Sequence, residues 1–288
     1  MTDIIFTSVE LGLLYALVVL GVFLTFRILN FPDLTVDGSF ATGAAATAIA
    51  IHAGVPGLIA IIVGFLAGFL AGSLTAFLHI RLGIGKILAG ILSLSMLYTI
   101  NLRLMGSPNL SLLNQENIIS FLKTPTNPIY TIIFLLAVVL FVKFLLDWFL
   151  QTEFGLQFRA TGDNESTSQS FAINTNAKKF LGIGLSNGLV GVAGGLVAQY
   201  QGFADVNMGI GTIILGLAAL MLGEVLILNG KIGTITTSII IGAILYQLII
   251  NFALRLGLAG TDLKFVTALI VVIALVIGNN KKYLSHDK

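Results

Sequence analysis

Long uncharged apolar runs are the feature that most limits how this chain can fold. Hydrophobic residues make up 57% of its 288 residues and charged residues only 10%, with a mean hydropathy of +1.02. A soluble domain carries about 25% charged residues, so this chain lacks the polar surface that water requires. A helix that crosses a bilayer needs about 20 mostly apolar residues. We therefore predict an all-α fold, a polytopic transmembrane helical bundle.

About nine segments, within a range of about eight to ten, are predicted to form this bundle. Seven runs have the required length and apolar character: Ile4–Phe26, Val55–Ile80, Ile87–Met105, Ile129–Leu150, Phe180–Gln201, Ile210–Leu228 and Ile232–Leu254. Two further runs, Leu34–Ile51 and Leu263–Gly278, are shorter. If Leu34–Ile51 is re-entrant, the total falls to eight and the amino terminus lies inside.

The distribution of basic residues predicts the orientation, because cytoplasmic loops carry an excess of lysine and arginine. With nine crossings and the amino terminus outside, eleven of the 15 basic residues lie on the cytoplasmic side: Arg27, Arg81, Lys86, Lys143, Arg159, Lys178, Lys179, Lys231, Lys281, Lys282 and Lys288. Only Arg103, Lys123, Arg255 and Lys264 lie outside. We therefore expect the amino terminus outside and the carboxyl terminus in the cytoplasm. The N-terminal sequence lacks a basic region and a small-residue cleavage site, so we expect the first helix to be retained.

Two loops are long. Residues 106–127 contain two prolines and several Asn and Ser residues, and are predicted to lie outside the membrane. Residues 151–179 form the most polar stretch of the chain and are predicted to lie inside. The cytoplasmic loop is therefore the expected contact surface for a soluble partner.

Glycine spacing predicts close helix packing. Gly64, Gly68 and Gly72 recur every four residues and place a smooth groove on one helix face, where a neighbouring backbone can approach closely. A weak internal similarity also appears at an offset of 172 residues, where Phe31-Pro32-Asp33-Leu34 aligns with Phe203-Ala204-Asp205-Val206. This similarity is compatible with an inverted repeat, which is common in transporters, and also with chance in a chain of few residue types.

Several kinds of chemistry are excluded or unsupported. The chain has no cysteine, and no phosphate-binding G-x-x-x-x-G-K-[ST] loop occurs in it. Its three histidines, His52, His79 and His286, are far apart and no His/Glu pair has metal-ligand spacing. We therefore expect no enzyme activity, no metal or other cofactor bound by this chain, and no binding of nucleic acid.

Four acidic residues at or near membrane depth are candidates for a translocation path or gate. A charge at the bilayer centre costs roughly 2.5–3.5 kcal/mol on insertion scales, so it is normally paired or functional. Glu10 either lines a substrate path or pairs with a base such as Arg103, and Glu224 is expected near Lys231 or the cytoplasmic gate. Asp33 and Asp37 open the short second helix, where simple capping also explains them.

Local signals divide the cytoplasmic loop into two short helices. Residues Leu156–Ala160 are predicted to form one amphipathic turn that is broken at Gly162. Asp163 or Asn164 then caps a second short helix that runs to Ala172. Two such helices across the membrane face, with an exposed arginine and acids, form a docking surface.

The run T-E-F-G-L-Q-F-R-A-T-G-D-N at residues 152–164 resembles the cytoplasmic coupling segment of ABC-importer permeases. The group that it resembles is the branched-chain amino-acid and ribose-type permease family. Similar patterns are Gly12–Leu17, then Leu29–Leu34 ahead of a Gly/Ala-rich helix, and Leu217–Gly223. Asp33, Asp37 and Glu224 depart from the family pattern, which indicates a side branch whose cargo is an amino acid, aromatic ones included, or else a sugar.

The resemblance implies a single permease domain over residues 1–288 in the bacterial cytoplasmic membrane. It implies a homodimer of two permease copies in lipid, two ATP-binding subunits that use ATP and Mg, and an extracytoplasmic substrate-binding protein. The residues that it assigns to ATPase coupling are Glu153, Gly155, Arg159, Gly162, Asp163 and Asn164. The alternatives are an ion-coupled secondary transporter that uses Glu10 or Glu224, and a membrane scaffold or channel subunit.

Overall fold

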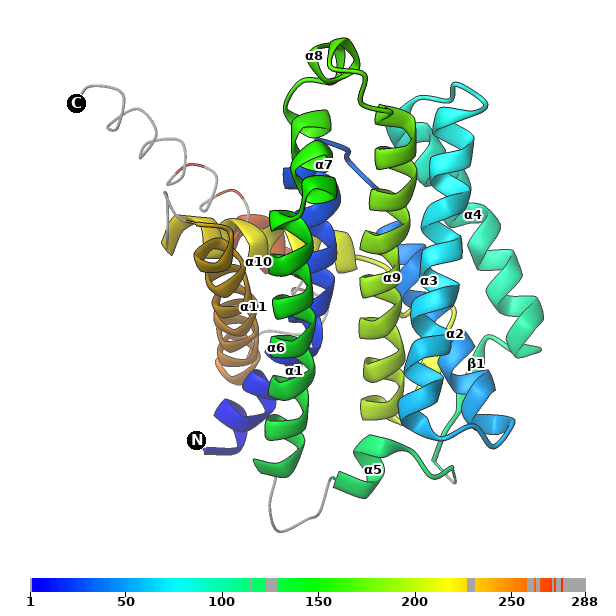
Figure 1. Ribbon diagram of the computed structural model, residues 1–288. Coiled ribbons are helices and arrows are strands. Elements are labelled where there is room, and N and C mark those ends of the chain that lie inside the picture. Colours follow the sequence, from blue (N-terminus) through cyan, green and yellow to red (C-terminus); the bar gives the residue numbers. More distant parts are fainter. Residues whose placement is uncertain are drawn as a thin grey trace.

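The computed structural model describes residues 2–113, 115–122, 129–226, 231–257, 262, 265–270, 272 and 276. In chain order its elements are α1 (Thr2–Val22), the π-helix η1 (Phe23–Ile28), α2 (Val36–His52), α3 (Gly57–Ile80), α4 (Lys86–Met105), β1 (Asn109–Ser111), α5 (Ile118–Leu122), α6 (Ile129–Gln151), α7 (Glu153–Asp163), α8 (Glu165–Ser170), α9 (Thr175–Gln201), β2 (Phe203–Asp205), α10 (Thr212–Leu226) and α11 (Ile232–Arg255). The result is a helical bundle, as predicted (Figure 1).

Six of the described helices are long and apolar enough to cross a membrane: α1, continued by η1, and α3, α4, α6, α9 and α11. The helices α2 and α10, with 17 and 15 residues, are shorter. Each follows a non-helical stretch, residues 29–35 and 202–211 respectively. The helix in the predicted span Ile210–Leu228 therefore begins at Thr212, and residues 227 and 228 lie outside the described residues. Half of the predicted last span, Leu263–Gly278, lies outside the described residues, and its described residues 265–270, 272 and 276 are helical.

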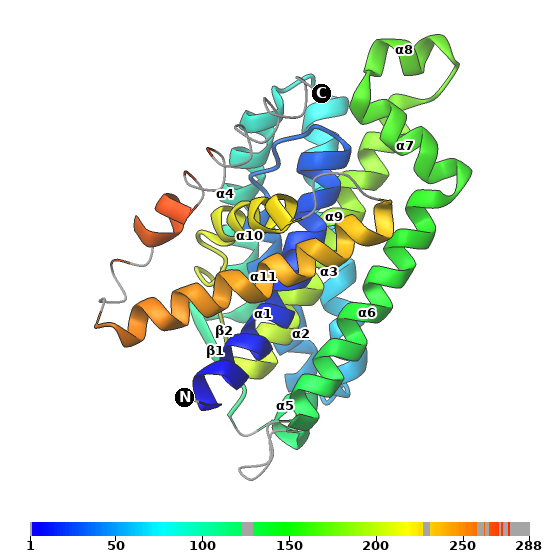
Figure 2. The same ribbon diagram turned by 90° about the vertical axis from the view of Figure 1, so that its left-hand side faces the viewer.

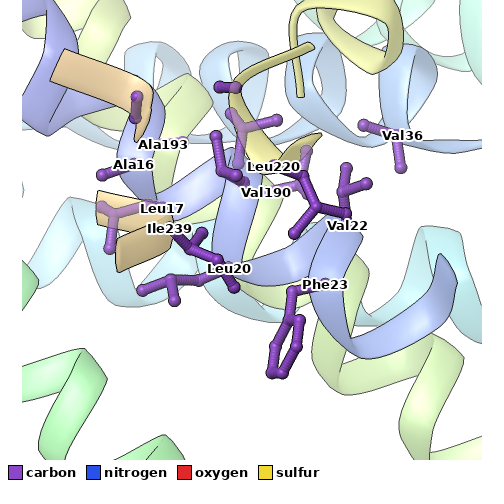
Figure 3. Packing of buried hydrophobic residues seen from close by; sticks show 14 of the residues in the cluster. Ala16, Leu17, Leu20, Val22, Phe23, Val36, Val190, Ala193, Leu220 and Ile239 are labelled. Atoms are coloured by element: carbon purple, nitrogen blue, oxygen red, sulfur yellow. The ribbon is translucent and has the colours of Figure 1, made fainter. Parts of the chain in front are cut away.

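Helix α9 lies at the centre of the bundle because its residues are small. In the most apolar 18-residue stretch of α1, and likewise of α9, 78% of the residues are buried, against 28% in α4 and 22% in α6. The outer helices therefore leave many large apolar side chains exposed on the surface of the bundle. Helices α1 and α9 form the core, as their central positions show (Figures 1 and 2). Figure 3 shows the cluster that results, with Leu17, Leu20 and Val22 of α1 packed near Val190 and Ala193 of α9, Leu220 of α10 and Ile239 of α11.

The glycine groove on α3 faces α9 at backbone distance. A Cβ atom added to Gly68 would overlap the carbonyl oxygen of Asn187, and one on Gly72 would lie 2.5 Å from the carbonyl oxygen of Ile183. Gly64 meets α2 and α9 together, since a Cβ atom there would lie 2.5 Å from Thr47 Oγ1 and 3.3 Å from the Gly191 carbonyl oxygen. Only glycine allows helices to approach so closely.

The packing partners form two equivalent sets of three helices. The first set is α1, α2 and α3, and the second is α9, α10 and α11. Within the sets α2 packs on α3 and α10 packs on α11. Between the sets α1 contacts α10 and α11, and α9 contacts α2 and α3. Exchanging α1, α2 and α3 for α9, α10 and α11 therefore leaves the pattern unchanged. The end of η1, which continues α1, lies against α7 at Gly162, and α9 begins beside α8 at Thr175, so α1 and α9 run in opposite directions. This is the arrangement of an inverted repeat, and the two segments that align at offset 172 lie just ahead of α2 and α10.

The predicted outer loop has structure of its own. Strand β1 pairs antiparallel with β2, with Asn109 opposite Asp205 and Ser111 opposite Phe203. The short helix α5 follows, and its first amide donates to the side-chain oxygen of Gln199 in α9 at 3.2 Å. Both elements lie at the end of the bundle opposite α8 (Figure 1).

We expect Gly68→Ala to push α3 away from α9 and to destabilise the bundle. Overpacking of a filled core costs about 1–3 kcal/mol, so the thermal unfolding midpoint in detergent should fall by several degrees. Gly85→Ala is the matched control, because a Cβ atom there meets nothing within 4 Å. Equal midpoints for the two variants would contradict close α3–α9 packing.

Candidate translocation and coupling sites

Asp37 joins the two short helices at their amino-terminal ends. Its Oδ1 accepts hydrogen bonds from the backbone N–H of Ile213 at 2.8 Å and from Thr212 Oγ1 at 2.9 Å, and its Oδ2 accepts from the N–H of Gly211 at 2.9 Å. Asp37 lies in the first turn of α2, as expected, but its carboxylate binds the amino-terminal end of α10, which begins 175 residues further along the chain. The positive end of the α10 dipole stabilises the carboxylate at this depth.

Asp33 fastens the segment before α2 to the central helix. Its carboxylate is buried, with Oδ2 accepting from Asn187 Nδ2 at 2.6 Å and Oδ1 accepting from the N–H of Thr35 at 2.9 Å. Asp205 makes the equivalent turn before α10, where it accepts from the N–H of Asn207 at 2.8 Å. Among the described residues, neither Asp33 nor Asp37 forms a salt bridge.

A pocket of about 330 Å³ lies beside Asp37, between α2, α4 and the segment that leads into α10. Tyr98 and Asn101 line it from α4, and Asn207 and Ile210 line it from the other side. Asn101 is 1% exposed, and its Oδ1 accepts no hydrogen bond from any residue that the structure describes. Of the four acidic candidates, only Asp37 contributes to this pocket.

The other two acidic candidates have partners that differ from those expected. Glu10 is buried and accepts a hydrogen bond from the hydroxyl of Tyr200 at 2.7 Å, which is a contact between α1 and α9 rather than with Arg103. Glu224 forms a salt bridge with Arg27, with 2.8 Å between Oε1 and Nε, and Arg27 rather than Lys231 is its partner. This second pair ties η1, the wide last turn of the first helix, to the end of α10.

Sequence reasoning missed a fifth acid at membrane depth. Asp147 of α6 is paired with Lys143 at 2.6 Å and accepts from Thr236 Oγ1 of α11 at 2.7 Å. Its i, i+4 spacing from a lysine within one apolar helix was the available signal. This carboxylate therefore serves to hold α6 against α11.

The long polar loop, which is predicted to be cytoplasmic, forms a compact pair of helices. Helix α7 begins after Thr152, whose hydroxyl accepts from the N–H of Gly155 at 3.2 Å, and α8 begins after Asn164, whose side chain accepts from the N–H of Thr167 at 3.0 Å. Asn164 is thus the cap of the second helix, which ends at Ser170 and not at Ala172. We call α7 and α8 together, residues 153–170, the coupling hairpin.

Gly162 does not break the first helix as predicted, because α7 continues through it to Asp163. A Cβ atom on Gly162 would overlap the carbonyl oxygen of Ile28 at the end of η1. Gly155 has a similar role in the tight turn from α6, where a Cβ atom would overlap the carbonyl oxygen of Phe149. Both glycines therefore serve close packing rather than helix termination.

An aromatic side chain anchors the coupling hairpin to the core. Phe158 is fully buried and packs so tightly on Gly182 of α9 that a Cβ atom on this glycine would overlap the ring. Glu165 of α8 forms a salt bridge with Lys179 of α9, and the Lys179 ammonium group lowers the pKa of the Glu165 carboxyl group. Neither Phe158 nor Glu165 was a predicted site residue, although Phe158 is an apolar residue in a polar loop.

The predicted coupling residues divide into a buried and an accessible group. Gly155 is buried and Gly162 half-buried against the bundle. Glu153, Asp163 and Asn164 are exposed and Arg159 is half-buried. Arg159 takes part in none of the salt bridges between described residues. The coupling hairpin thus presents charged groups outward while its inner face is fixed to η1, which continues the first helix, and to α9.

Comparison of the sequence with known proteins identifies its family. Residues 4–278 match the family described as "Branched-chain amino acid transport system / permease component". A "Tyrosine transport system permease protein" from Clostridioides difficile (strain R20291) is 40% identical over 268 residues, which cover 93% of this chain and 89% of that protein. An uncharacterised protein from Rickettsia prowazekii (strain Madrid E) is 32% identical over 187 residues, 65% of each chain.

A solved structure has a similar fold. It is described as an inward-facing conformation of a putative metal-chelate type ABC transporter, and it superposes with a TM-score of 0.50 at 18% identity, covering 96% of this chain and 85% of that one. At this identity the likeness concerns the fold alone. Since the family match spans nearly the whole sequence, this chain belongs to the branched-chain amino acid transport permeases, a family of ABC transporter permease components.

Proposed function

We propose that this chain is the membrane-spanning permease subunit of an ATP-driven importer that moves an amino acid into the cell by alternating access. The observation that carries the proposal is the coupling hairpin. A charged outer surface whose inner face is fixed to the two central helices can pass the motion of a docked subunit into the bundle. A channel or scaffold subunit needs no such element.

The proposed assembly contains two copies of this chain and two ATP-binding subunits, which bind ATP and Mg and supply the ATPase activity. These subunits dock on the coupling hairpins at the cytoplasmic face, and a substrate-binding protein delivers the cargo at the opposite face. The amino terminus then lies outside and the carboxyl terminus in the cytoplasm, as the distribution of basic residues predicts.

Movement of the hairpin reaches the bundle at two contacts. The first is Gly162 against Ile28 at the end of η1, and the second is Phe158 against Gly182 in α9. Because η1 also carries Arg27, the same movement changes the distance between Arg27 and Glu224 of α10. We propose this salt bridge as a latch that closes the cytoplasmic end of the path.

The proposed cargo is an amino acid with an aromatic side chain. Support comes from the relative named as a tyrosine transport permease. This chain is 40% identical to it, over 89% of the length of that relative. An ion-coupled carrier is disfavoured, because the buried Glu10 accepts a hydrogen bond from Tyr200 and Glu224 is paired with Arg27. A carboxylate that carries an ion must be free to exchange its partners.

Purification of the tagged chain from its host in mild detergent tests the proposal. Mass spectrometry should find an ATPase with a phosphate-binding loop in equal amount, and uptake of radiolabelled tyrosine should stop when the cells are depleted of ATP at a constant ion gradient. Uptake that survives ATP depletion would contradict the proposal and favour an ion-coupled carrier.

Arg159→Glu should uncouple ATP hydrolysis from uptake. The change reverses the charge on the outer face of α7 without touching the packing at Phe158, so the protein should fold and assemble. We expect uptake to fall at least about ten-fold, equivalent to about 1.4 kcal/mol, while the ATPase of the complex continues. Arg103→Glu, the same charge change on the exposed side of α4, is the control. Unchanged uptake by Arg159→Glu would remove this role.

Reversing the charges of the proposed latch separates gating from stability. An exposed ion pair contributes about 0.2–1 kcal/mol to stability, so Arg27→Glu alone should barely change the unfolding midpoint. It should nevertheless impair tyrosine uptake several-fold, because two carboxylates would then face each other at this contact, and their repulsion would hold the cytoplasmic end open. The double variant Arg27→Glu/Glu224→Arg should regain most of the uptake, and failure of this rescue argues against the latch.

A further inference from the structure

We propose that the pocket beside Asp37 is a binding site for the zwitterionic head of the transported amino acid, with the side chain of the ligand lying toward Tyr98. The inference rests on the proposed function, and it adds a specific site within the permease. Its volume of about 330 Å³ lies within the range of small-molecule sites, about 300–1,000 Å³.

The first observation is a polar group that lacks a partner. Asn101 is 1% exposed and lines the pocket from α4, yet its Oδ1 accepts no hydrogen bond within the described part of the chain. A buried polar atom without a partner costs about 1–3 kcal/mol. A ligand ammonium group in the pocket would supply the missing donor.

The second observation is the electrostatic balance of the pocket. Its wall includes Asp37 and Gly38 from the first turn of α2, and Thr35, the residue before this helix, makes no side-chain capping hydrogen bond to it. The amino-terminal end of α10 meets the same carboxylate through Gly211 and Ile213. Each helix end is equivalent to roughly half a positive charge, so the two ends together offset the one carboxylate in the pocket wall, while the Asp33 carboxylate lies outside that wall and binds Asn187 and Thr35.

A site of nearly zero net charge with separated poles favours a ligand of the same kind. In the proposed pose the ammonium group of the zwitterion lies toward Asp37 and Asn101, and its carboxylate lies toward the first turn of α2. A purely cationic or purely anionic ligand would satisfy one pole and leave the other unpaired. Half-helix ends in discontinuous segments serve anionic groups of substrates in other transporters.

The remaining wall suits an apolar or aromatic side chain. Leu94 and Tyr98 of α4 face Val206 and Ile210 of the segment before α10. Tyr98 is 46% exposed in the single chain, so its ring is available for stacking against a ligand ring. The pocket therefore separates a polar head region from an apolar region, as an aromatic amino acid requires.

The test uses the purified full-length permease in nanodiscs with tritiated L-tyrosine as the probe. Unlabelled L-tyrosine should displace it best. Tyramine, which lacks the carboxylate, and 3-(4-hydroxyphenyl)propanoate, which lacks the ammonium group, should each be at least about ten-fold weaker, as loss of a charge-assisted hydrogen bond predicts. Equal displacement by the propanoate would overturn the proposal.

Three variants localise the binding. Asn101→Ala should weaken tyrosine binding about ten-fold, whereas Thr99→Ala, an exposed neighbour on α4 outside the pocket, should leave it unchanged. Asp37→Asn removes a negative charge, so the propanoate should gain affinity relative to tyrosine, a reversal that loss of folding cannot produce. Unchanged tyrosine binding by Asn101→Ala, or an unchanged ratio of the tyrosine and propanoate affinities in Asp37→Asn, would overturn the site.

The site and the proposed function fail in distinguishable ways. Absence of saturable tyrosine binding to the permease would overturn the site, while ATP-dependent uptake in cells would leave the importer proposal standing. Saturable binding without ATP dependence of uptake would retain the site and remove the importer.

Discussion

The structure depends on the close approach of backbones around α9. Gly191 lies against Gly43 of α2 on one side and against Gly64 and Gly68 of α3 on the other, at distances that leave no room for a Cβ atom. Dispersion contacts between such closely packed backbones drive helix association in lipid, where burial of apolar surface gives no advantage over contact with lipid tails. Because α9 is held in this way, the short helix α2 and its partner α10 can begin within the bundle instead of at its surface.

Two interrupted helices at membrane depth impose a second constraint. Non-helical backbone is tolerated there only where it is buried in protein or lines a cavity. Asp33 meets this requirement for the segment before α2 by binding Thr35 and Asn187, and Asp37 meets it for α10. The same carboxylate and helix ends then form one wall of the pocket. The features that make the interruption stable are thus also those that give the pocket its polarity.

Hydropathy alone was sufficient to predict the bundle, its long helices and the polar loop that forms the coupling hairpin, because each depends on local composition. What it could not supply were contacts between distant residues. Gly162 was interpreted as a helix breaker, whereas it allows α7 to lie on Ile28. For Asp37 the sequence offered a cap or a place on the translocation path, and for Glu224 a place near Lys231 or the cytoplasmic gate. It could not name their partners, α10 and Arg27, because both come from distant segments. The unpaired Asn101 has no signature in the sequence at all.

The account requires that the coupling hairpin and the β1–α5 loop lie on opposite sides of the membrane, with the hairpin in the cytoplasm. Because the chain contains no cysteine, single cysteines can be introduced directly, at Ser170 in α8 and at Leu113, which is 82% exposed between β1 and α5. A membrane-impermeant maleimide is added to cells whose outer membrane is permeabilised and whose cytoplasmic membrane is intact. It should label Leu113→Cys and not Ser170→Cys. In inverted membrane vesicles it should label Ser170→Cys and not Leu113→Cys. Labelling of Ser170→Cys from outside the cytoplasmic membrane would place the hairpin away from ATP and contradict the account.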